Sequence, residues 1–144
     1  MTAAARAASA IAAALLSACI ASNVVAPEHR LVVADAADVA RLDWGPADAN
    51  ALEGWFESVD LHGDAAASLR KIFYVFQRDG TYTGAALADV DGRLAFQTLS
   101  GTWSVAPDGL VLDGAAPVRC EAAAGHVRVT DANGVVVLRR GPLP

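Results

Sequence analysis

The fold follows most directly from the sequence Leu69-Arg-Lys-Ile-Phe-Tyr-Val-Phe-Gln-Arg-Asp-Gly-Thr-Tyr-Thr-Gly-Ala-Ala-Leu87. Its first part, Leu69–Phe76, is rich in aromatic and β-branched side chains, which favour a β-strand. Both faces of this strand are apolar in the middle, which is typical of a central strand or of one that lines a cavity. A second strand-like run, Thr81–Leu87, follows after Asp79-Gly80. Because Asp-Gly suits a type I′ turn, with positive φ at both central residues, we predict a hairpin here.

Similar turn signals divide the rest of the C-terminal region into short strands. The turn signals are Asp91-Gly92, Asp108-Gly109, Gly125 and Asn133-Gly134. The segments of strand-like composition in the β region are Gly54–Leu61, which is followed by the connection His62-Gly-Asp64, and Arg93–Leu99, Gly101–Val105, Leu110–Leu112, His126–Thr130 and Val135–Arg139. In the first segment, alternation places on one face the side chains of Trp55, Glu57, Val59 and Leu61. Turns that recur every 8 to 20 residues or so predict an all-β antiparallel meander.

The residues before this meander predict a tether and a short lead-in. Residues 19–30 are small and polar with no sustained period, as expected of a tether. In the lead-in, residues 31–51, we predict a short strand at Leu31–Ala34 and a helix at Asp35–Leu42 with an N-terminal aspartate cap. A further helical turn is predicted at Pro46–Leu52, since proline suits the first helical position. Residues 52–140 then form the β domain.

The N-terminal segment, residues 1–18, has the pattern of an export signal. One positive charge, Arg6, precedes the apolar run Ala7–Ala18. The run has 12 residues, whereas a membrane-spanning helix needs roughly 20. This length and charge pattern predicts a signal peptide. A buried amphipathic helix is the alternative, although the run has no polar face.

The end of that run, Leu16-Ser17-Ala18-Cys19, resembles the lipobox of bacterial lipoproteins. The resemblance implies a thioether-linked lipid on Cys19, cleavage between Ala18 and Cys19, and acylation of the new amino terminus. A thiol provides the nucleophile for such chemistry, and two or more acyl chains attach a protein stably to a membrane. We therefore expect an exported lipoprotein of the cell envelope, on the outer membrane and facing the periplasm or the cell surface. A plain secretory signal cleaved near Ala21 is the alternative.

Charge identifies no partner for this chain. Its 54% hydrophobic and 19% charged residues exclude a disordered chain, and its net charge of −5 argues against nucleic acid. Cleavage before Cys19 would remove Arg6 and leave 10 basic against 16 acidic residues, a net charge of −6. No basic cluster lies beside Cys19, so the acyl chains rather than electrostatic attraction would hold the protein to the membrane.

The second cysteine, Cys120, is predicted to pack in the core. A lipidated Cys19 cannot form a disulfide with it. On a strand, Val118, Cys120 and Ala122 share one face, which suits a small buried hydrophobic residue.

Four motifs of the β region resemble small bacterial lipocalin-like lipoprotein domains. They are Leu-x-Gly-Trp at Leu52–Trp55, Phe-x-x-Asp-Gly-Thr-Tyr at Phe76–Tyr82, Gly-Thr-Trp-Ser at Gly101–Ser104 and Leu-Arg-Arg at Leu138–Arg140. The resemblance covers Leu52–Arg140 and implies a small antiparallel barrel or half-barrel. Lipocalins place Gly-x-Trp on the first strand, whereas Gly54 and Trp55 are adjacent here.

The same resemblance implies a contact between the last and first strands. An arginine of the last strand, Arg139 or Arg140, would cover Trp55, with a cation–π attraction worth about 0.5–2 kcal/mol. The alternative is that both arginines are solvated residues at a sheet edge.

Catalytic and metal-binding signatures are missing from the sequence. His29, His62 and His126 lie in three separate segments, and Asp89 and Asp91 lack an EF-hand pattern. No phosphate loop, nucleophile elbow or dinucleotide fingerprint appears. We therefore expect no enzyme, no cofactor and no metal.

Binding of a small apolar ligand is the function that this sequence favours, because barrels with apolar linings hold such molecules. The candidate lining residues are Phe73, Phe76, Tyr82, Phe96 and Trp103. The alternative is a filled core in a structural or protein-interaction domain of the cell envelope.

Overall fold

The predicted hairpin lies at the centre of the fold. In the computed structural model, which describes residues 39–142, β3 (Leu69–Phe76) pairs antiparallel with β4 (Thr81–Val90). β4 pairs along its whole length with β5 (Arg93–Ala106). β5 is one continuous strand, although the sequence predicted two separate segments within it.

The remaining elements are short. They are β1 (Gly45–Pro46), α4 (Ala49–Leu52), β2 (Gly54–Gly63), α5 (Asp64–Ser68), β6 (Gly109–Leu112), β7 (Arg119–Ala123), β8 (His126–Asp131) and β9 (Gly134–Arg140). Within residues 39–142, no helix has the length and apolar character needed to cross a membrane.

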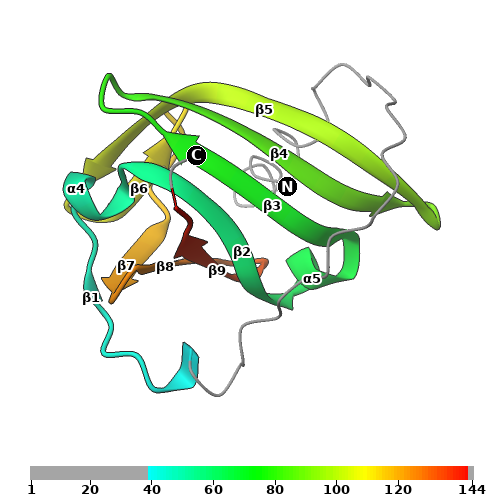
Figure 1. The fold of residues 1–144 in the computed structure, drawn as a ribbon, viewed down its shortest axis with the longest axis horizontal. Helices are drawn as coiled ribbons and strands as arrows, with labels where there is room; N and C mark the ends of the chain where they lie inside the picture. The colour runs from blue at the N-terminus through cyan, green and yellow to red at the C-terminus, as the bar shows by residue number, and fades with distance from the viewer. Residues whose placement is uncertain (1–38, 143–144) are drawn as a thin grey trace, which may run out of the picture.

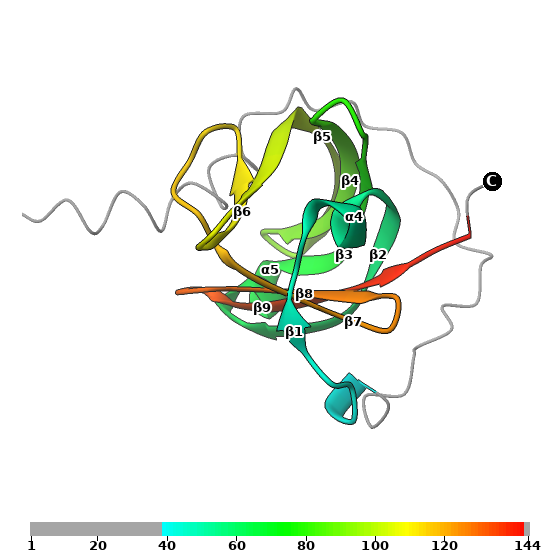
Figure 2. The same cartoon turned by 90° about the vertical axis from the view of Figure 1, so that its left-hand side faces the viewer.

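The strands of the described region form one antiparallel sheet that curls into a nearly closed barrel (Figure 1). Their order is β1-β7-β8-β9-β2-β3-β4-β5-β6. β6 and β7 meet at Leu110 and Val118, whose backbone N–H groups each donate to the other's carbonyl at 2.9 Å. Figure 2 shows this arrangement from the end that carries α4. The predicted all-β barrel is confirmed.

The core takes inward side chains from α4 and from every strand between β2 and β9. They are Leu52, Phe56, Leu69, Ile72, Phe76, Tyr82, Ala86, Trp103, Leu110, Cys120, Val127 and Leu138. The packing role predicted for Cys120 is confirmed, and its burial, with the nearby Glu121 carboxylate, raises the pKa of its thiol to about 12.

Strand β2 departs from the predicted alternation. Trp55 and Glu57 do lie on the face opposite the buried Phe56. After Ser58, however, the pairing with β9 shifts register, as at a β-bulge. Leu61 consequently packs against the core rather than sharing the face of Trp55. One extra residue in a strand reverses the faces of all residues after it.

The turns use more than one geometry. In the turn after β3, Gly80 has the positive φ and its N–H donates to the Gln77 carbonyl at 3.1 Å. This is a type I turn followed by a left-handed glycine, not the predicted type I′ turn. Asp91-Gly92 does have two positive φ angles, 53° and 76°, as type I′ requires. In the turn from β5 to β6, Ala106 pairs with Gly109, so the two central residues are Pro107 and Asp108. Proline fixes a negative φ at the first of them, which excludes a type I′ turn.

The lead-in covers one end of the barrel. Asp48 caps α4 by accepting a hydrogen bond from the Ala51 N–H at 2.8 Å, and Leu52 is fully buried in the core. The predicted helical turn therefore begins at Ala49 rather than at Pro46, which instead pairs with Glu121 in β1. A short edge strand tolerates proline because its missing N–H leaves no ladder bond unmade.

Several predictions fall on residues outside those described. They are the export signal 1–18, Cys19, the tether 19–30 with His29, the strand Leu31–Ala34 and residues 35–38 of the predicted helix. The described end of that helix has Val39 and Ala40 in helical conformation, and the Leu42 N–H donates to the Val39 carbonyl at 3.3 Å.

Candidate functional site

The five aromatic residues predicted to line a ligand site lie on two sides of the sheet. Phe76, Tyr82 and Trp103 point into the barrel, with 2%, 5% and 8% of their surface exposed. Phe73 lies on the outer face, and Phe96 is 44% exposed. The structure therefore brings three of the five together and leaves two outside, because alternate residues of a strand point to opposite faces.

The three inward aromatic rings fill the end of the barrel near α4. Phe76 packs edge-on against Trp103, with ring centroids 5.4 Å apart. The Trp103 Nε1–H donates to the Gln77 carbonyl at 2.9 Å, and the Tyr82 hydroxyl donates to Asp113 Oδ2 at 2.8 Å. Burial and the hydrogen bond to Asp113 hold the pKa of Tyr82 well above its ordinary value. With rings packed and polar tips paired, this end behaves as core rather than as a cavity.

Arg140 closes the same end of the barrel. Its guanidinium lies over the Phe56 ring, 4.8 Å from the centroid, and donates to the carbonyl of Ala51 at 2.8 Å and to that of Glu53. The lipocalin-like resemblance implied an arginine over Trp55. The structure corrects this to Phe56, because Phe56 is the residue that faces Arg140 across the pairing of β2 with β9.

Arg139 belongs to an ion-pair network on the outer face. It contacts Glu57 Oε1 at 2.5 Å, while Lys71 Nζ lies 2.8 Å from Glu57 Oε2. Burial by itself would raise the pKa of Glu57, but the hydrogen bonds from Lys71 and Arg139 outweigh it and hold that pKa below its ordinary value. Beside them, Phe73 stacks on Trp55 with ring centroids 5.9 Å apart. The side chains of this network tie β2, β3 and β9 together.

Gln97 is the polar residue that the sequence did not single out. It lies on the inward face of β5, in line with Trp103 and opposite Ala86, which is fully buried. Its Oε1 atom is buried, and no donor among the described residues reaches it. A buried acceptor without a partner costs about 1–3 kcal/mol. The sequence signal that points to it is the alternation Ala95, Gln97, Leu99, which lies on the same face of the strand as the aromatic Trp103.

The two described histidines have local partners. His62 Nε2 lies 2.7 Å from Asp60 Oδ2, and His126 Nδ1 lies 3.1 Å from a backbone carbonyl two residues away. Asp89 pairs with Arg70 at 2.9 Å. Within residues 39–142, the structure gathers no group of three or more His, Cys, Asp or Glu side chains that could hold a metal ion.

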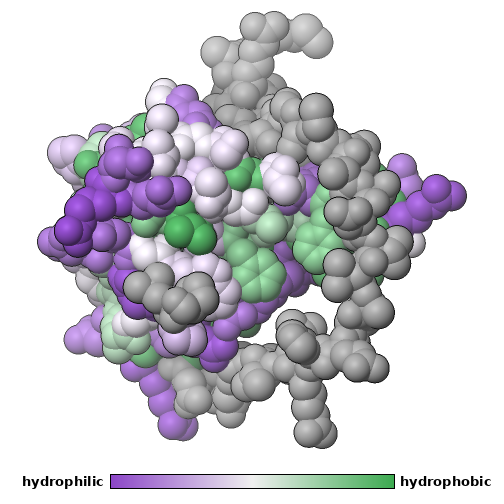
Figure 3. All heavy atoms as spheres, turned by 45° about the horizontal axis from the view of Figure 1, so that its top comes forward, coloured by the Kyte–Doolittle hydropathy of each residue, from purple (hydrophilic) through white to green (hydrophobic). Residues whose placement is uncertain are grey.

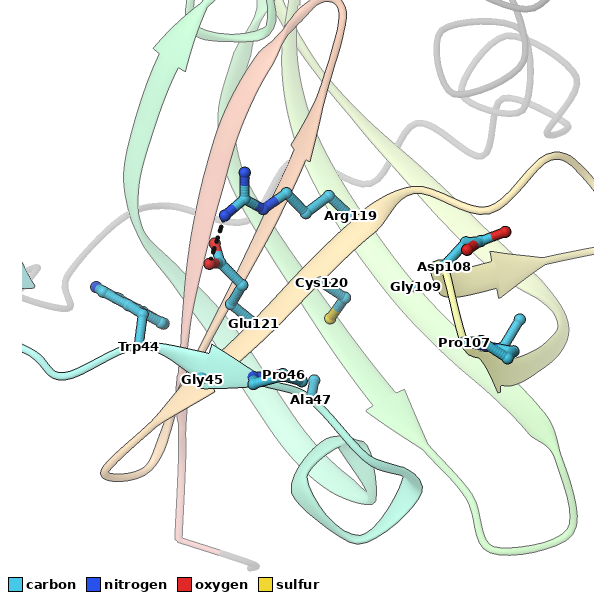
Figure 4. A pocket seen from close by; sticks show the side chains of 11 residues that line it. Trp44, Gly45, Pro46, Ala47, Pro107, Asp108, Gly109, Arg119, Cys120 and Glu121 are labelled. Atoms are coloured by element: carbon cyan, nitrogen blue, oxygen red, sulfur yellow. Dashed lines mark hydrogen bonds and ion pairs between the residues drawn. The ribbon is translucent and has the colours of Figure 1, made fainter.

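Two hollows lie outside the aromatic cluster. One, of about 250 Å³, lies between β1, β7 and the turn from β5 to β6; Figure 4 shows Cys120 between its two sides. Its Arg119 and Glu121 form an ion pair at 2.9 Å. The second, of about 280 Å³, borders α4 and the turn from β7 to β8. It includes Arg140, whose guanidinium already donates a hydrogen bond to the Ala51 carbonyl of α4. Neither hollow contains any of the five predicted aromatic residues.

Comparisons of this chain with models of protein families, with curated proteins and with solved structures find no match. The nearly closed antiparallel barrel is consistent with a lipocalin-like fold.

Proposed function

We propose that this chain is an exported, lipid-anchored protein of the cell envelope whose barrel binds a small, largely apolar ligand through Gln97. The buried, unpartnered Oε1 atom of Gln97 is the observation that carries the ligand proposal. Buried polar atoms in proteins nearly always have a hydrogen-bond partner, and an exception is expected where a ligand or water supplies it. A ligand donor at this atom would remove the cost of leaving it unpaired.

The surroundings of Gln97 define the class of ligand. Figure 1 shows α4 and α5 at opposite ends of the barrel, and Gln97 lies four residues from the start of β5, toward the α5 end. The inward positions beside it carry small apolar side chains at Ala86, Ala88 and Ala95. We therefore expect a ligand with an apolar body and one hydrogen-bond donor, such as an alcohol or an amide N–H.

The anchor proposal rests on Leu16-Ser17-Ala18-Cys19 and on the chain length after it. Cys19 and Val39, the first described residue, are 20 positions apart. A chain of that length spans at most about 70 Å when fully extended. The tether and the first part of the lead-in, taken together, would keep the barrel near the membrane and leave it free to take up ligand there.

Native mass spectrometry of the full-length protein, purified without organic extraction, tests the ligand proposal. We expect a bound molecule on the wild-type protein and its loss from the Gln97→Leu variant. Thr98→Val, at an exposed outward position of the same strand, is the matched control and should keep the molecule. Wild-type protein without any bound molecule would instead favour the filled core of a structural or interaction domain.

Incorporation of radiolabelled palmitate tests the anchor. We expect label on the wild-type chain and on Cys120→Ala, which retains the lipobox cysteine. Label that persists on Cys19→Ala would exclude lipidation at Cys19.

A further inference from the structure

We infer that β5 pairs along its free edge with β5 of a second copy of this chain, antiparallel and about a two-fold axis. β4 pairs with one edge of β5 at residues 93–102, whereas β6 pairs with the other edge only at residues 103–106. Among the residues that the structure describes, none pairs with this second edge between Leu94 and Ser100, which we call the free edge. Figure 1 shows β5 along the top of the barrel, with β4 below it.

Thr102 shows which backbone groups face the free edge. Its N–H donates to Asp113 Oδ1 at 2.8 Å and its carbonyl accepts from the Asp113 N–H at 2.9 Å. The next residue, Trp103, donates its N–H to the Gly80 carbonyl on the β4 side. Because alternate residues of an antiparallel strand direct their N–H and C=O groups to opposite edges, the even-numbered residues face away from β4. On the free edge these are Leu94, Phe96, Thr98 and Ser100.

The free edge lacks the features that usually protect an edge strand. The stretch Leu94-Ala-Phe-Gln-Thr-Leu-Ser100 contains no charged residue, no proline and no glycine, and no register shift interrupts its pairing with β4. On its outer face, Leu94 and Phe96 are 65% and 44% exposed. In Figure 3, which brings the top of Figure 1 forward, hydrophobic atoms lie in the middle of the visible face. An edge of this kind is a template on which another strand can add.

Two charges favour a second copy of this chain as that strand. Arg93 and Asp113 form no ion pair with any residue between 39 and 142. Arg93 lies at the start of the free edge, on the inward face that carries Gln97. The Asp113 carboxylate lies at the other end, in the place that a Cβ atom of Gly101 would take. Arg93 and Gly101 each lie four residues from Gln97. A two-fold axis at Gln97 would therefore set Arg93 of each copy opposite Gly101, and so beside Asp113, of the other.

The same axis completes the backbone ladder. It pairs Leu94 with Ser100, and Phe96 with Thr98, of the second copy, and all of these residues direct their N–H and C=O groups to the free edge. Hydrogen bonding and charge thus select one register independently. A strand of unrelated sequence would complete the ladder but would not bring a carboxylate to Arg93 and a cation to Asp113.

Sedimentation velocity of the full-length chain carrying Cys19→Ser, which removes the proposed site of lipidation, tests the dimer. The paired edge is shorter than the roughly 20–30 residues a side of a stable interface, so we expect a weak dimer that forms between about 1 μM and 1 mM. Thr98→Pro removes an N–H that faces the free edge and leaves the ladder to β4 intact, so it should weaken association at least about tenfold. Thr98→Val keeps that N–H and is the matched control.

A wild type that stays monomeric throughout this range, as it would if residues 19–38 of the same chain covered the edge, would overturn the inference. Equal association of Thr98→Pro and Thr98→Val, each shown by urea unfolding to be folded, would also overturn it.

A charge reversal tests the partner without altering the backbone. Arg93→Glu should weaken association about tenfold at low salt and much less at high salt, because two ion pairs become two repulsions. Arg41→Glu makes the same change in net charge at an exposed residue outside the sheet and should associate as the wild type does. Equal association of these two variants would overturn the two-fold register and with it the proposed partner.

Cross-linking locates the axis. In the Cys19→Ser chain, Gln97→Cys should form a disulfide with its own copy on mild oxidation, because the axis sets the two positions side by side. Ala95→Cys, on the same face, would lie about 13 Å from its own copy and should not cross-link. Cross-linking at 95 instead of 97, or at neither position, would overturn the inference. Gln97→Leu should dimerise as the wild type does, so loss of the proposed ligand and loss of the dimer give separate results.

Discussion

Replacing Gln97 with leucine should stabilise the ligand-free barrel. Leucine has a similar size but no polar atom, so the variant removes a buried acceptor that no described donor reaches. Since such an atom costs about 1–3 kcal/mol and part of the side chain stays exposed, we expect the free energy of unfolding to rise by about 1–2 kcal/mol. For a domain of roughly 100 residues, each kcal/mol corresponds to a rise in Tm of about 4–8 °C. Urea unfolding followed by tryptophan fluorescence measures the change, because Trp103 lies in the core.

Ligand must first be removed by unfolding the protein in guanidinium chloride and refolding it, since a bound ligand would stabilise the wild type selectively. Thr98→Val, on the outer face of the same strand, should change the unfolding free energy by less than about 0.5 kcal/mol. If Gln97→Leu lowers the unfolding free energy by about 1 kcal/mol or more, Gln97 makes hydrogen bonds within the empty protein. The reasoning that links its Oε1 atom to a ligand would then be refuted.

Three further variants test other parts of the barrel. Tyr82→Phe removes the hydroxyl that donates to Asp113, and because Asp113 is exposed and water can replace that donor, we expect a loss of only about 1 kcal/mol in urea unfolding. Glu57 has a lowered pKa in the folded protein, so its ionised form contributes to the free energy of unfolding above the ordinary pKa of 4.5, and this contribution is lost as the pH falls through the folded value. Glu57→Gln should therefore flatten the pH dependence of Tm in that acidic range. An unchanged slope would contradict the ion-pair network. Gly109→Ala would place a Cβ atom against the Val118 carbonyl, where β6 meets β7, and at a φ of 137° that residues with a side chain rarely adopt. We therefore expect a lower Tm and faster amide exchange at Leu110. Unchanged exchange at Leu110 would show that this contact does not close the barrel.

The positions of the turns are predictable because their signals are local, although the turn after β3 is not of the predicted type. Asp91-Gly92 adopts the predicted type I′ turn, and the strand predicted at Leu69–Phe76 has those bounds in the structure. The bulge after Ser58, by contrast, has no local signal of this kind, because no glycine lies between Ser58 and Asp60. The register shift depends on the pairing of β2 with β9. Pairing between distant strands is a tertiary property that local propensity does not encode.

The predicted inward position of Phe96 on β5 is wrong for a similar reason. The sequence predicts Phe96 to line the barrel because it is one of the large aromatic residues of the β region. No register shift interrupts the pairing of β4 with β5, so the buried Trp103 sets the facing of the whole strand and turns Gln97 inward. In an amphipathic strand the more apolar face points inward, but this rule does not assign the inward face of a strand whose two faces are both partly apolar. The sequence alone therefore does not place Gln97 inside the barrel.

The most direct test of ligand binding is a fluorescence titration of the ligand-free protein with N-phenyl-1-naphthylamine, which has an apolar body and one N–H donor. We expect saturable binding of one probe per chain, about five- to tenfold weaker in Gln97→Leu because one hydrogen bond is lost. Thr98→Val should bind as the wild type does. Absence of saturable binding, or equal affinities of the wild type and Gln97→Leu, would contradict a ligand site at Gln97.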